Sequence, residues 1–316
     1  MGTRVLATTG IVLALSAVTP APAAATGREY STAAYRGLAA WIDIYDHGPW
    51  QRPERTVRSL ARRGVGTLFV QTSNHRQRRA LHRPARLSRL LAAAGLRGLR
   101  TVAWYLPGFD RPRRDWRRVK AAVTYVSSAG HRFDGFAMDI EATAVRDIAE
   151  RNRRMLRLSS RLRRLVGPGA AVGAIIPDPV TQRYWPRFPY RQLRSLYDVF
   201  LPMAYWTSQA RGAARVHSYT RAAIRLIRAR TGDPSVPVHV IGGIANLASV
   251  GEVRAFARAA VRFAAAGASL YDAPITSGAK WDELWRIGRV NERAARAPAA
   301  LGSSRKCGCR ASASGR

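Results

Sequence analysis

Two carboxylic acids stand two residues apart at the end of an apolar run, and this pair is the strongest candidate for chemistry in the sequence. Asp139 and Glu141 close the segment 136–141. Side chains alternate between the two faces of a strand, so both acids are predicted to point one way and the large apolar residues between them the other way. Neighbouring carboxyl groups in a low dielectric raise each other's pKa, as a general acid at neutral pH requires. The alternative is that both acids pair with arginines.

Polar and aromatic residues also gather at the ends of other short apolar runs, whereas the starts of these runs carry almost none. They are Asp43 and Asp46, Asn74 and His75, Trp104 and Tyr105, Asp178, Tyr205 and Trp206, Asn246, and Tyr271 and Asp272. An aromatic ring can cover the apolar face of a sugar while its edge stays polar. We therefore predict a carbohydrate cleft.

The predicted substrate-binding residues of this cleft are Asp43, Trp104, Tyr105, Asp178, Trp206, Tyr271 and Asp272. Simpler readings exist for two of them, since Asp43 can cap a turn and Asp178 lies in a Pro-Asp-Pro turn sequence. His75 has no second His or Cys at ligand spacing, so it is interpreted as a loop residue. We predict neither a metal nor an organic cofactor.

Strand-length apolar runs alternate with amphipathic segments along the chain. The predicted strands are 38–43, 66–71, 100–105, 136–141, 171–176, 199–205, 238–243 and 268–272. The predicted helices are 54–63, 86–94, 114–129, 144–166, 191–196, 213–230, 250–266 and 281–290. Strands that alternate with helices form parallel sheets, and eight such units without a dinucleotide-binding glycine motif favour a closed barrel. The fold class is therefore α/β, a single (β/α)8 barrel over residues 33–292, with its active site at the carboxyl ends of the strands.

The two ends of the chain lack this pattern. Residues 1–25 combine a short basic start, an apolar run and small residues, as a cleaved secretory signal does. Residues 293–316 are rich in Ala, Ser, Gly and Arg and are predicted to be a disordered basic tail; they contain both cysteines, Cys307 and Cys309, to which no role is assigned. No segment is long and apolar enough to span a membrane. We expect a secreted protein, extracellular or associated with the cell wall.

The charge is strongly positive, with 53 basic against 19 acidic residues and a formal net charge of +34. Such a surface can attract anionic polymers such as those of a cell wall. The arginines are spread along the predicted helices without a nucleic-acid motif, so no specific nucleic-acid partner is expected. The simpler alternative is a solvated surface whose arginines reflect biased composition.

The fourth predicted strand resembles a known signature. Residues 134–141, Asp-Gly-Phe-Ala-Met-Asp-Ile-Glu, resemble the Asp-Gly-x-Asp-x-Asp-x-Glu of family 18 glycoside hydrolases, the chitinase-like barrels, and Met203-Ala204-Tyr205 resembles their sixth-strand Met-x-Tyr. The resemblance implies that Glu141 protonates the glycosidic oxygen. It further implies that Asp139 orients the acetamido group of the substrate as an internal nucleophile and that Tyr205 hydrogen-bonds this group.

Three positions depart from that pattern: Ala137 replaces the middle Asp, Trp206 follows the Tyr in place of Asp or Asn, and Tyr271 replaces a Trp. A weaker similarity is to family 25 muramidases, whose first-strand Asp and fourth-strand Asp-x-Glu match Asp43, Asp139 and Glu141. A third similarity is to other glycoside-hydrolase-like barrels of exported bacterial proteins.

The sequence thus predicts a secreted glycoside hydrolase that cleaves an N-acetylhexosamine-containing polysaccharide, chitin-like or peptidoglycan, by substrate-assisted retaining catalysis. The alternative is a catalytically idle barrel that binds glycan or an anionic wall polymer, and Ala137 is the residue that favours it.

Overall fold

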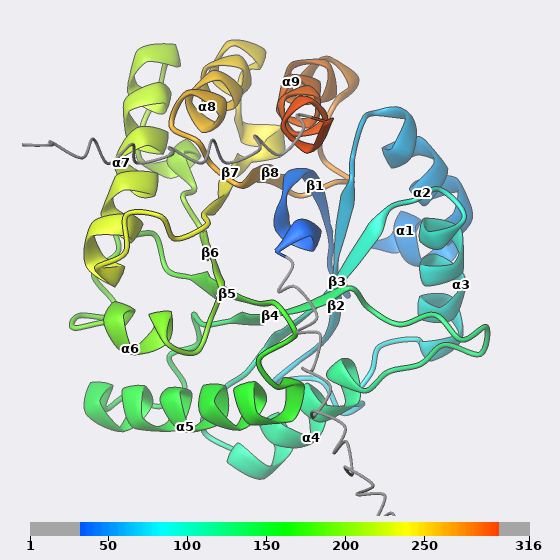
Figure 1. Cartoon of the computed structure of the whole chain (residues 1–316), viewed down its shortest axis with the longest axis vertical. Coiled ribbons are helices and arrows are strands. Elements are labelled where there is room, and N and C mark those ends of the chain that lie inside the picture. The colour runs from blue at the N-terminus through cyan, green and yellow to red at the C-terminus, as the bar shows by residue number, and fades with distance from the viewer. Residues whose placement is uncertain (1–31, 297–316) are drawn as a thin grey trace, which may run out of the picture.

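A closed ring of parallel strands surrounded by helices forms the core of the molecule (Figure 1). The computed structural model describes residues 32–296. The strands are β1 Gly37–Ile42, β2 Thr67–Asn74, β3 Arg100–Leu106, β4 Gly135–Asp139, β5 Val172–Ile176, β6 Val199–Pro202, β7 His239–Ile244 and β8 Gly267–Tyr271. They follow the order β6-β5-β4-β3-β2-β1-β8-β7, and the bridges Phe200↔Val238 and Met203↔Ile241 join β6 to β7. The predicted (β/α)8 barrel is confirmed.

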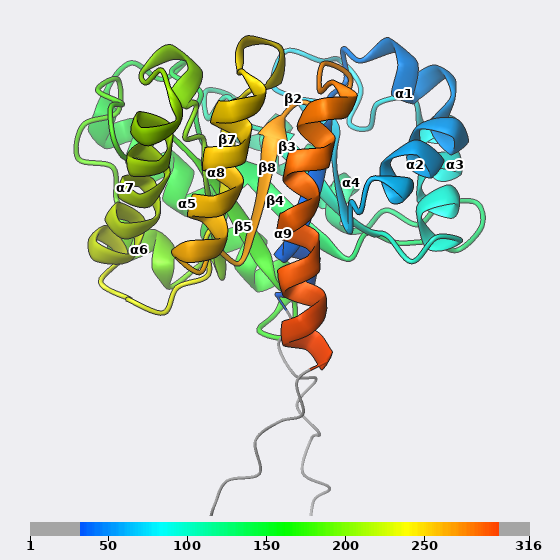
Figure 2. The same ribbon diagram turned by 90° about the horizontal axis from the view of Figure 1, so that it is seen from above.

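Helices connect successive strands on the outside of the ring. They are α1 His47–Gln51, α2 Pro53–Arg62, α3 Pro84–Gly95, α4 Pro112–Val123, α5 Ile148–Val166, α6 Tyr190–Arg194, α7 Ala213–Thr231, α8 Val250–Arg262 and α9 Gly278–Arg296. Short 3₁₀ turns lie at Ala33–Tyr35, Trp206–Ser208 and Ala245–Leu247. Figure 2 shows α8 and α9 side by side in front of β7 and β8. Among the described helices, none is long and apolar enough to cross a membrane.

Element ends differ from the sequence prediction by a few residues. Helix α4 ends at Val123 instead of 129, because the following segment folds into a turn in which Ser127 Oγ accepts a hydrogen bond from His131 N at 2.9 Å. Helix α5 begins after its N-cap Asp147, whose side chain accepts from Glu150 N. Helix α9 continues through 296, into the segment 293–316 predicted as a tail. The rest of that segment, with both cysteines, and the predicted signal 1–25 lie outside the described residues.

Strand alternation separates two hydrophobic clusters and decides which side chains reach the site. One cluster fills the barrel interior and includes Trp41, Phe69, Trp104 and Ala137. The other lies between the strands and the helices and includes Phe136 and Met138, the neighbours of Ala137 along β4. The Trp41 and Phe69 rings stack inside the barrel with centroids 4.3 Å apart. The interior is thus a packed core, and only its layer of side chains at the carboxyl ends of the strands borders a cavity.

Candidate active site

A cavity of about 800 Å³ opens at the carboxyl ends of the strands. Its wall comes from residues of several strand ends and the loops that follow them: Asp43, Tyr45, Gln71, Asn74, His75, Arg76, Trp104, Leu106, Asp139, Glu141, Ala142, Thr143, Ala144, Arg146, Met203, Tyr205, Ile244 and Tyr271. The volume lies in the range of cavities that enclose small ligands, and in barrels of this fold the active site lies at this end.

Asp139 and Glu141 both line this cavity from the end of β4. Asp139 is 5% exposed, and Glu141 is half-buried. Strand pairing continues past β4, since Ile140 N donates to Ile175 O at 2.8 Å, and this keeps the two acids on the same face. Neither carboxyl group forms an ion pair or a hydrogen bond with other residues in the part of the chain that the structure describes. The alternative of pairing with arginines therefore fails.

Burial sets the protonation of both acids. It raises the pKa of Asp139 well above its ordinary range, and the charge of Glu141 raises it further. Burial also raises the pKa of Glu141. A proton held by the pair at neutral pH is what a general acid needs, and Glu141, the more accessible of the two, is placed to donate it to a ligand in the cavity.

The layer beneath Asp139 is apolar. Ala137 is fully buried in the barrel interior and pairs in register with Trp104 on β3. Asp139 Oδ1 and Trp104 Nε1 are both buried and lack a hydrogen-bond partner among the described residues. No neighbouring side chain therefore holds Asp139 in place, and its pKa is raised by burial and by the Glu141 charge, without a second acid at position 137.

Tyr205, Tyr271 and Asp43 face the acid pair from other strand ends. The Tyr205 and Tyr271 rings lie with centroids 6.1 Å apart, and the Tyr271 hydroxyl donates to Asp43 Oδ2 at 2.7 Å. Asp43 Oδ1 accepts from the backbone N of Tyr45 at 2.6 Å and of Asp46 at 3.1 Å. Both oxygens of Asp43 are thus already engaged, which makes this residue a support for the Tyr271 ring as well as a part of the cavity wall.

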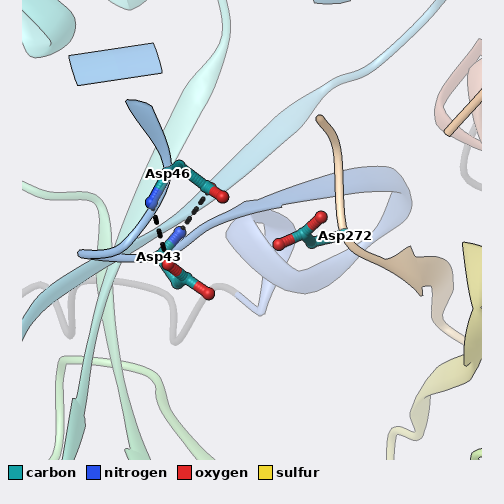
Figure 3. A group of neighbouring side chains, drawn as sticks. All are labelled: Asp43, Asp46 and Asp272. Carbon is teal, nitrogen blue, oxygen red and sulfur yellow. Dashed lines mark hydrogen bonds between the residues drawn. The ribbon is translucent and has the colours of Figure 1, made fainter. Parts of the chain in front are cut away.

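A cluster of three acids lies beside Tyr271, formed by Asp43, Asp46 and Asp272 (Figure 3). Asp43 and Asp46 follow β1 and are linked by the two backbone-to-carboxylate bonds drawn there, while the Asp272 carboxylate approaches them from the end of β8. One oxygen of each acid lies within 4.8 Å of the others, so these are the described residues that could hold a metal ion. Burial, together with the charges of its two neighbours, raises the pKa of Asp46 to about 7, and burial and the Asp43 charge raise that of Asp272 to about 6.

We expect Asp46→Asn to stabilise the protein at pH 8 but not near pH 4. Because the pKa of Asp46 in the folded state is raised to about 7, the folded state binds more protons than the unfolded state between the two pKa values, and its stability falls as pH rises through this window. Asn keeps the acceptor oxygen and removes the charge. After allowance for partial exposure, we expect a gain of roughly 1 to 2 kcal/mol at pH 8. Urea unfolding at both pH values measures it, and a gain that is independent of pH would show that the charge of Asp46 is not its cause.

Four predicted substrate-binding residues do not line the cavity. Tyr105 and Trp206 belong to the cluster between strands and helices. The Tyr105 hydroxyl donates to Asp115 Oδ1 at 2.6 Å, and the Trp206 ring packs 4.7 Å from that of Phe256. Tyr105 follows the inward-facing Trp104 on β3, so alternation turns it outward, whereas Trp206 lies beyond β6 in the 3₁₀ turn Trp206–Ser208. This corrects their predicted place in the cleft.

Asp178 and Asp272 also have structural partners. Asp178 accepts hydrogen bonds from Val180 N at 3.0 Å and Thr181 N at 3.2 Å, as expected for a turn residue, and from the Tyr219 hydroxyl. The turn interpretation of Asp178 is therefore the one that the contacts support. Asp272 is buried in the acid cluster behind Tyr271, where it borders Asp46 instead of the cavity.

Several wall residues were not identified as site residues from the sequence. Tyr45 is 62% exposed at the mouth, where its hydroxyl accepts from Asn74 Nδ2 at 3.0 Å. Gln71 lies on the inward face of β2, and its Oε1 accepts from Ile44 N at 3.1 Å. Arg76 and Arg146 come from the loops after β2 and β4. Alternation along β2 could have identified Gln71. No feature of the sequence distinguishes Arg76 and Arg146 from the many other arginines of the chain.

Solved structures of glycoside hydrolases share this fold. The endo-β-1,4-mannanase of Thermotoga petrophila is 10% identical, with a TM-score of 0.63 over 81% of this chain and 77% of that protein. The spore cortex-lytic enzyme SleL of Bacillus cereus is 9% identical, with a TM-score of 0.58 over 80% and 74% of the two chains. A chitinase of Chromobacterium violaceum is 12% identical, with a TM-score of 0.55 over 80% and 99%.

At such low sequence identity, the structural likeness establishes the (β/α)8 barrel fold but neither the family nor the substrate of this chain. No family model matches the sequence, and a search of curated proteins finds no match. The catalytic interpretation therefore depends on the geometry of the cavity.

Proposed function

We propose that this protein is a glycoside hydrolase whose catalytic acid is Glu141. The observation that carries the proposal is a pair of acids in a strand-end cavity, both with raised pKa and neither hydrogen-bonded nor ion-paired to the rest of the described chain. An unpaired buried carboxyl group costs stability, so a site that retains two of them is better explained by chemistry than by folding.

The substrate class that this arrangement favours is an N-acetylhexosamine polymer. Asp139 and Glu141 lie on one face of one strand end, on the same side of a sugar bound in the cavity. This suits an acid with an orienting helper better than an acid opposite an enzyme nucleophile. Glu141 protonates the glycosidic oxygen as the bond from this oxygen to the anomeric carbon breaks and the acetamide oxygen of the sugar bonds to that carbon, while Asp139 holds the acetamide N–H. Water, deprotonated by Glu141, then attacks the anomeric carbon and releases the acetamide oxygen, which gives the hydrolysed sugar. Tyr205 borders the same space and hydrogen-bonds the acetamide.

The structural neighbours are compatible with this substrate class but do not select it, since they include proteins described as chitinases and as a spore cortex-lytic enzyme and also endo-mannanases. The substrate of this chain is proposed to be chitin-like or peptidoglycan. The acid chemistry needs no organic cofactor.

Incubation of the purified protein with chitin oligomers and with peptidoglycan tests the proposal through the appearance of new reducing ends. Hydrolysis of either N-acetylated polymer supports it. If neither polymer yields reducing ends while both bind, the catalytically idle barrel is the better description. Ala137 favours that second candidate, because it removes the acid that would lie beneath Asp139.

We further propose that the protein is exported and that its basic surface attracts an anionic wall polymer. Salt bridges engage only part of the arginine complement in the described region, so much of the positive charge faces solvent. Binding to an anionic wall preparation should weaken by about tenfold or more between roughly 0.01 M and 1 M salt, because the Debye length falls from about 30 Å to about 3 Å. A co-sedimentation series across this range measures it. Binding that does not change with salt would instead identify the aromatic cavity as the anchor.

A further inference from the structure

Two arginines at the mouth of the cavity have side chains without a partner among the residues that the structure describes. Arg76 follows β2, Arg146 lies between β4 and α5, and both line the cavity. Both are exposed, and within residues 32–288 neither guanidinium forms an ion pair or a hydrogen bond. Arg154 on α5, by contrast, is engaged with Glu150 and with the Phe109 carbonyl at 3.2 Å.

The backbone at each of these two residues is held in place, although the side chains are free. Arg76 N donates to Asn74 Oδ1 at 3.0 Å, and the fully buried Arg118 donates to the neighbouring His75 carbonyl at 3.3 Å. The buried Arg151 donates to the Arg146 carbonyl at 3.3 Å and to the Val145 carbonyl at 2.7 Å. Two buried arginines, Arg118 and Arg151, thus fix the backbone beside Arg76 and Arg146. Such support of the backbone is what a binding site requires of the segments that carry its side chains.

The arginines of the cavity wall come from the loops after β2 and β4. The strand order places β2 and β4 on either side of β3, whereas the acid cluster Asp43, Asp46 and Asp272 lies at β1 and β8. Burial, and then the Arg76 charge, lower the pKa of His75, which also lines the cavity. An anionic substituent on a bound sugar is therefore attracted towards Arg76 and Arg146, the two arginines among the residues that line the cavity.

We propose that Arg76 and Arg146 together bind a carboxylate carried by the glycan, so that the cavity selects a carboxylated N-acetylhexosamine polymer over a neutral one. The inference rests on one part of the proposed function, namely that the cavity binds a glycan. The planar guanidinium matches a carboxylate in a bidentate arrangement, whereas sugar hydroxyls have no need of a cation. The carboxylate can belong to a lactyl ether on the sugar ring or to a peptide attached to that ether.

Binding to a catalytically silenced protein tests the inference without requiring hydrolysis. Full-length protein with Glu141→Gln is titrated with three probes: peptide-free glycan strands of peptidoglycan, the same strands with their carboxylates amidated, and peptide-bearing strands. We expect the carboxylated strands to bind about tenfold or more tightly than the amidated ones. A preference already present in peptide-free strands identifies the lactyl carboxylate, and one that requires peptide-bearing strands identifies the peptide carboxylate.

The variants Arg76→Gln and Arg146→Gln should each reduce this affinity ratio, and together they should bring it close to one. Arg78→Gln and Arg117→Gln remove the same charge from exposed arginines that do not line the cavity, and they should keep the ratio. An unchanged ratio in the double variant, an equal loss in the controls, or no binding of any probe would overturn the inference. If the ratio responds as expected while the wild-type protein cleaves none of the probes, the proposed hydrolase function fails and the carboxylate site stands.

Discussion

The Glu141→Gln variant should lose about 10² to 10⁴ of the hydrolytic rate, the usual contribution of general acid catalysis, and remain folded. The amide keeps the shape of the side chain but has no proton to donate at the glycosidic oxygen. Stability should not suffer, because Glu141 forms no ion pair or hydrogen bond in the described part of the molecule and its charged form is disfavoured by burial. Reducing-end assays on N-acetylated oligomers measure the loss.

Glu54→Gln is a matched control for this variant, since Glu54 lies on α2, where it forms a surface ion pair with Arg89 at 2.6 Å. It should keep the wild-type rate. Equal urea midpoints for the two variants exclude unfolding as the cause of lost activity. Activity of Glu141→Gln within a factor of about three of wild type would remove Glu141 from the catalytic role, because that factor lies well below the contribution of a general acid.

Loss of the acetamido group from the substrate should reduce the rate by at least about 10²-fold, because the internal nucleophile and its effective concentration disappear with it. The comparison is between an N-acetylated oligomer and the same oligomer after chemical deacetylation, at saturating concentrations of each. Since Asp139 is proposed to hold the acetamide N–H, Asp139→Asn should weaken the preference for the acetylated substrate. Equal rates on both oligomers would show that the enzyme itself supplies the nucleophile.

The barrel was predictable because its signal is repeated along the chain. Each apolar run is followed by an amphipathic segment, and this alternation fixes a parallel sheet whatever the exact ends of its elements. The ends were less certain because local hydrogen bonds decide them. The turn in which His131 N donates to Ser127 Oγ, for example, follows an early end of α4 that hydrophobic periodicity does not show.

Part of the site was predictable from alternation on β4, which places Asp139 and Glu141 on the inner face. The same rule, applied to Trp104 and Tyr105 on β3, excludes Tyr105, since two consecutive residues of a strand cannot both face the interior; Trp206 lies in a 3₁₀ turn beyond β6, where the rule does not apply. Residue type alone therefore assigns too many aromatics to the cleft. Asp178 shows a similar limit, because a turn role and a binding role use the same residue type.

Other features depend on contacts between distant segments. The acid cluster joins the loop after β1 to the end of β8, so Asp46 and Asp272 acquire their raised pKa only in the folded chain. Arg76 and Arg146 differ from other arginines only in what surrounds them. Buried Arg118, which donates to the His75 carbonyl beside Arg76, comes from the distant α4, whereas Arg151, which donates to the Arg146 carbonyl, is only five residues away in the sequence.

The anomeric configuration of fresh product, followed by proton NMR during cleavage of an N-acetylated oligomer, tests most directly whether Glu141 acts with the sugar's own acetamide. The Cα atoms of Asp139 and Glu141 should lie about 6.5 to 7 Å apart at a rise of roughly 3.3 Å per residue, on one side of the sugar, so this pair supplies no nucleophile opposite the acid. We predict that the first product retains the configuration of the substrate. Inversion would contradict the substrate-assisted mechanism, and Asp43, across the cavity, would become the candidate base.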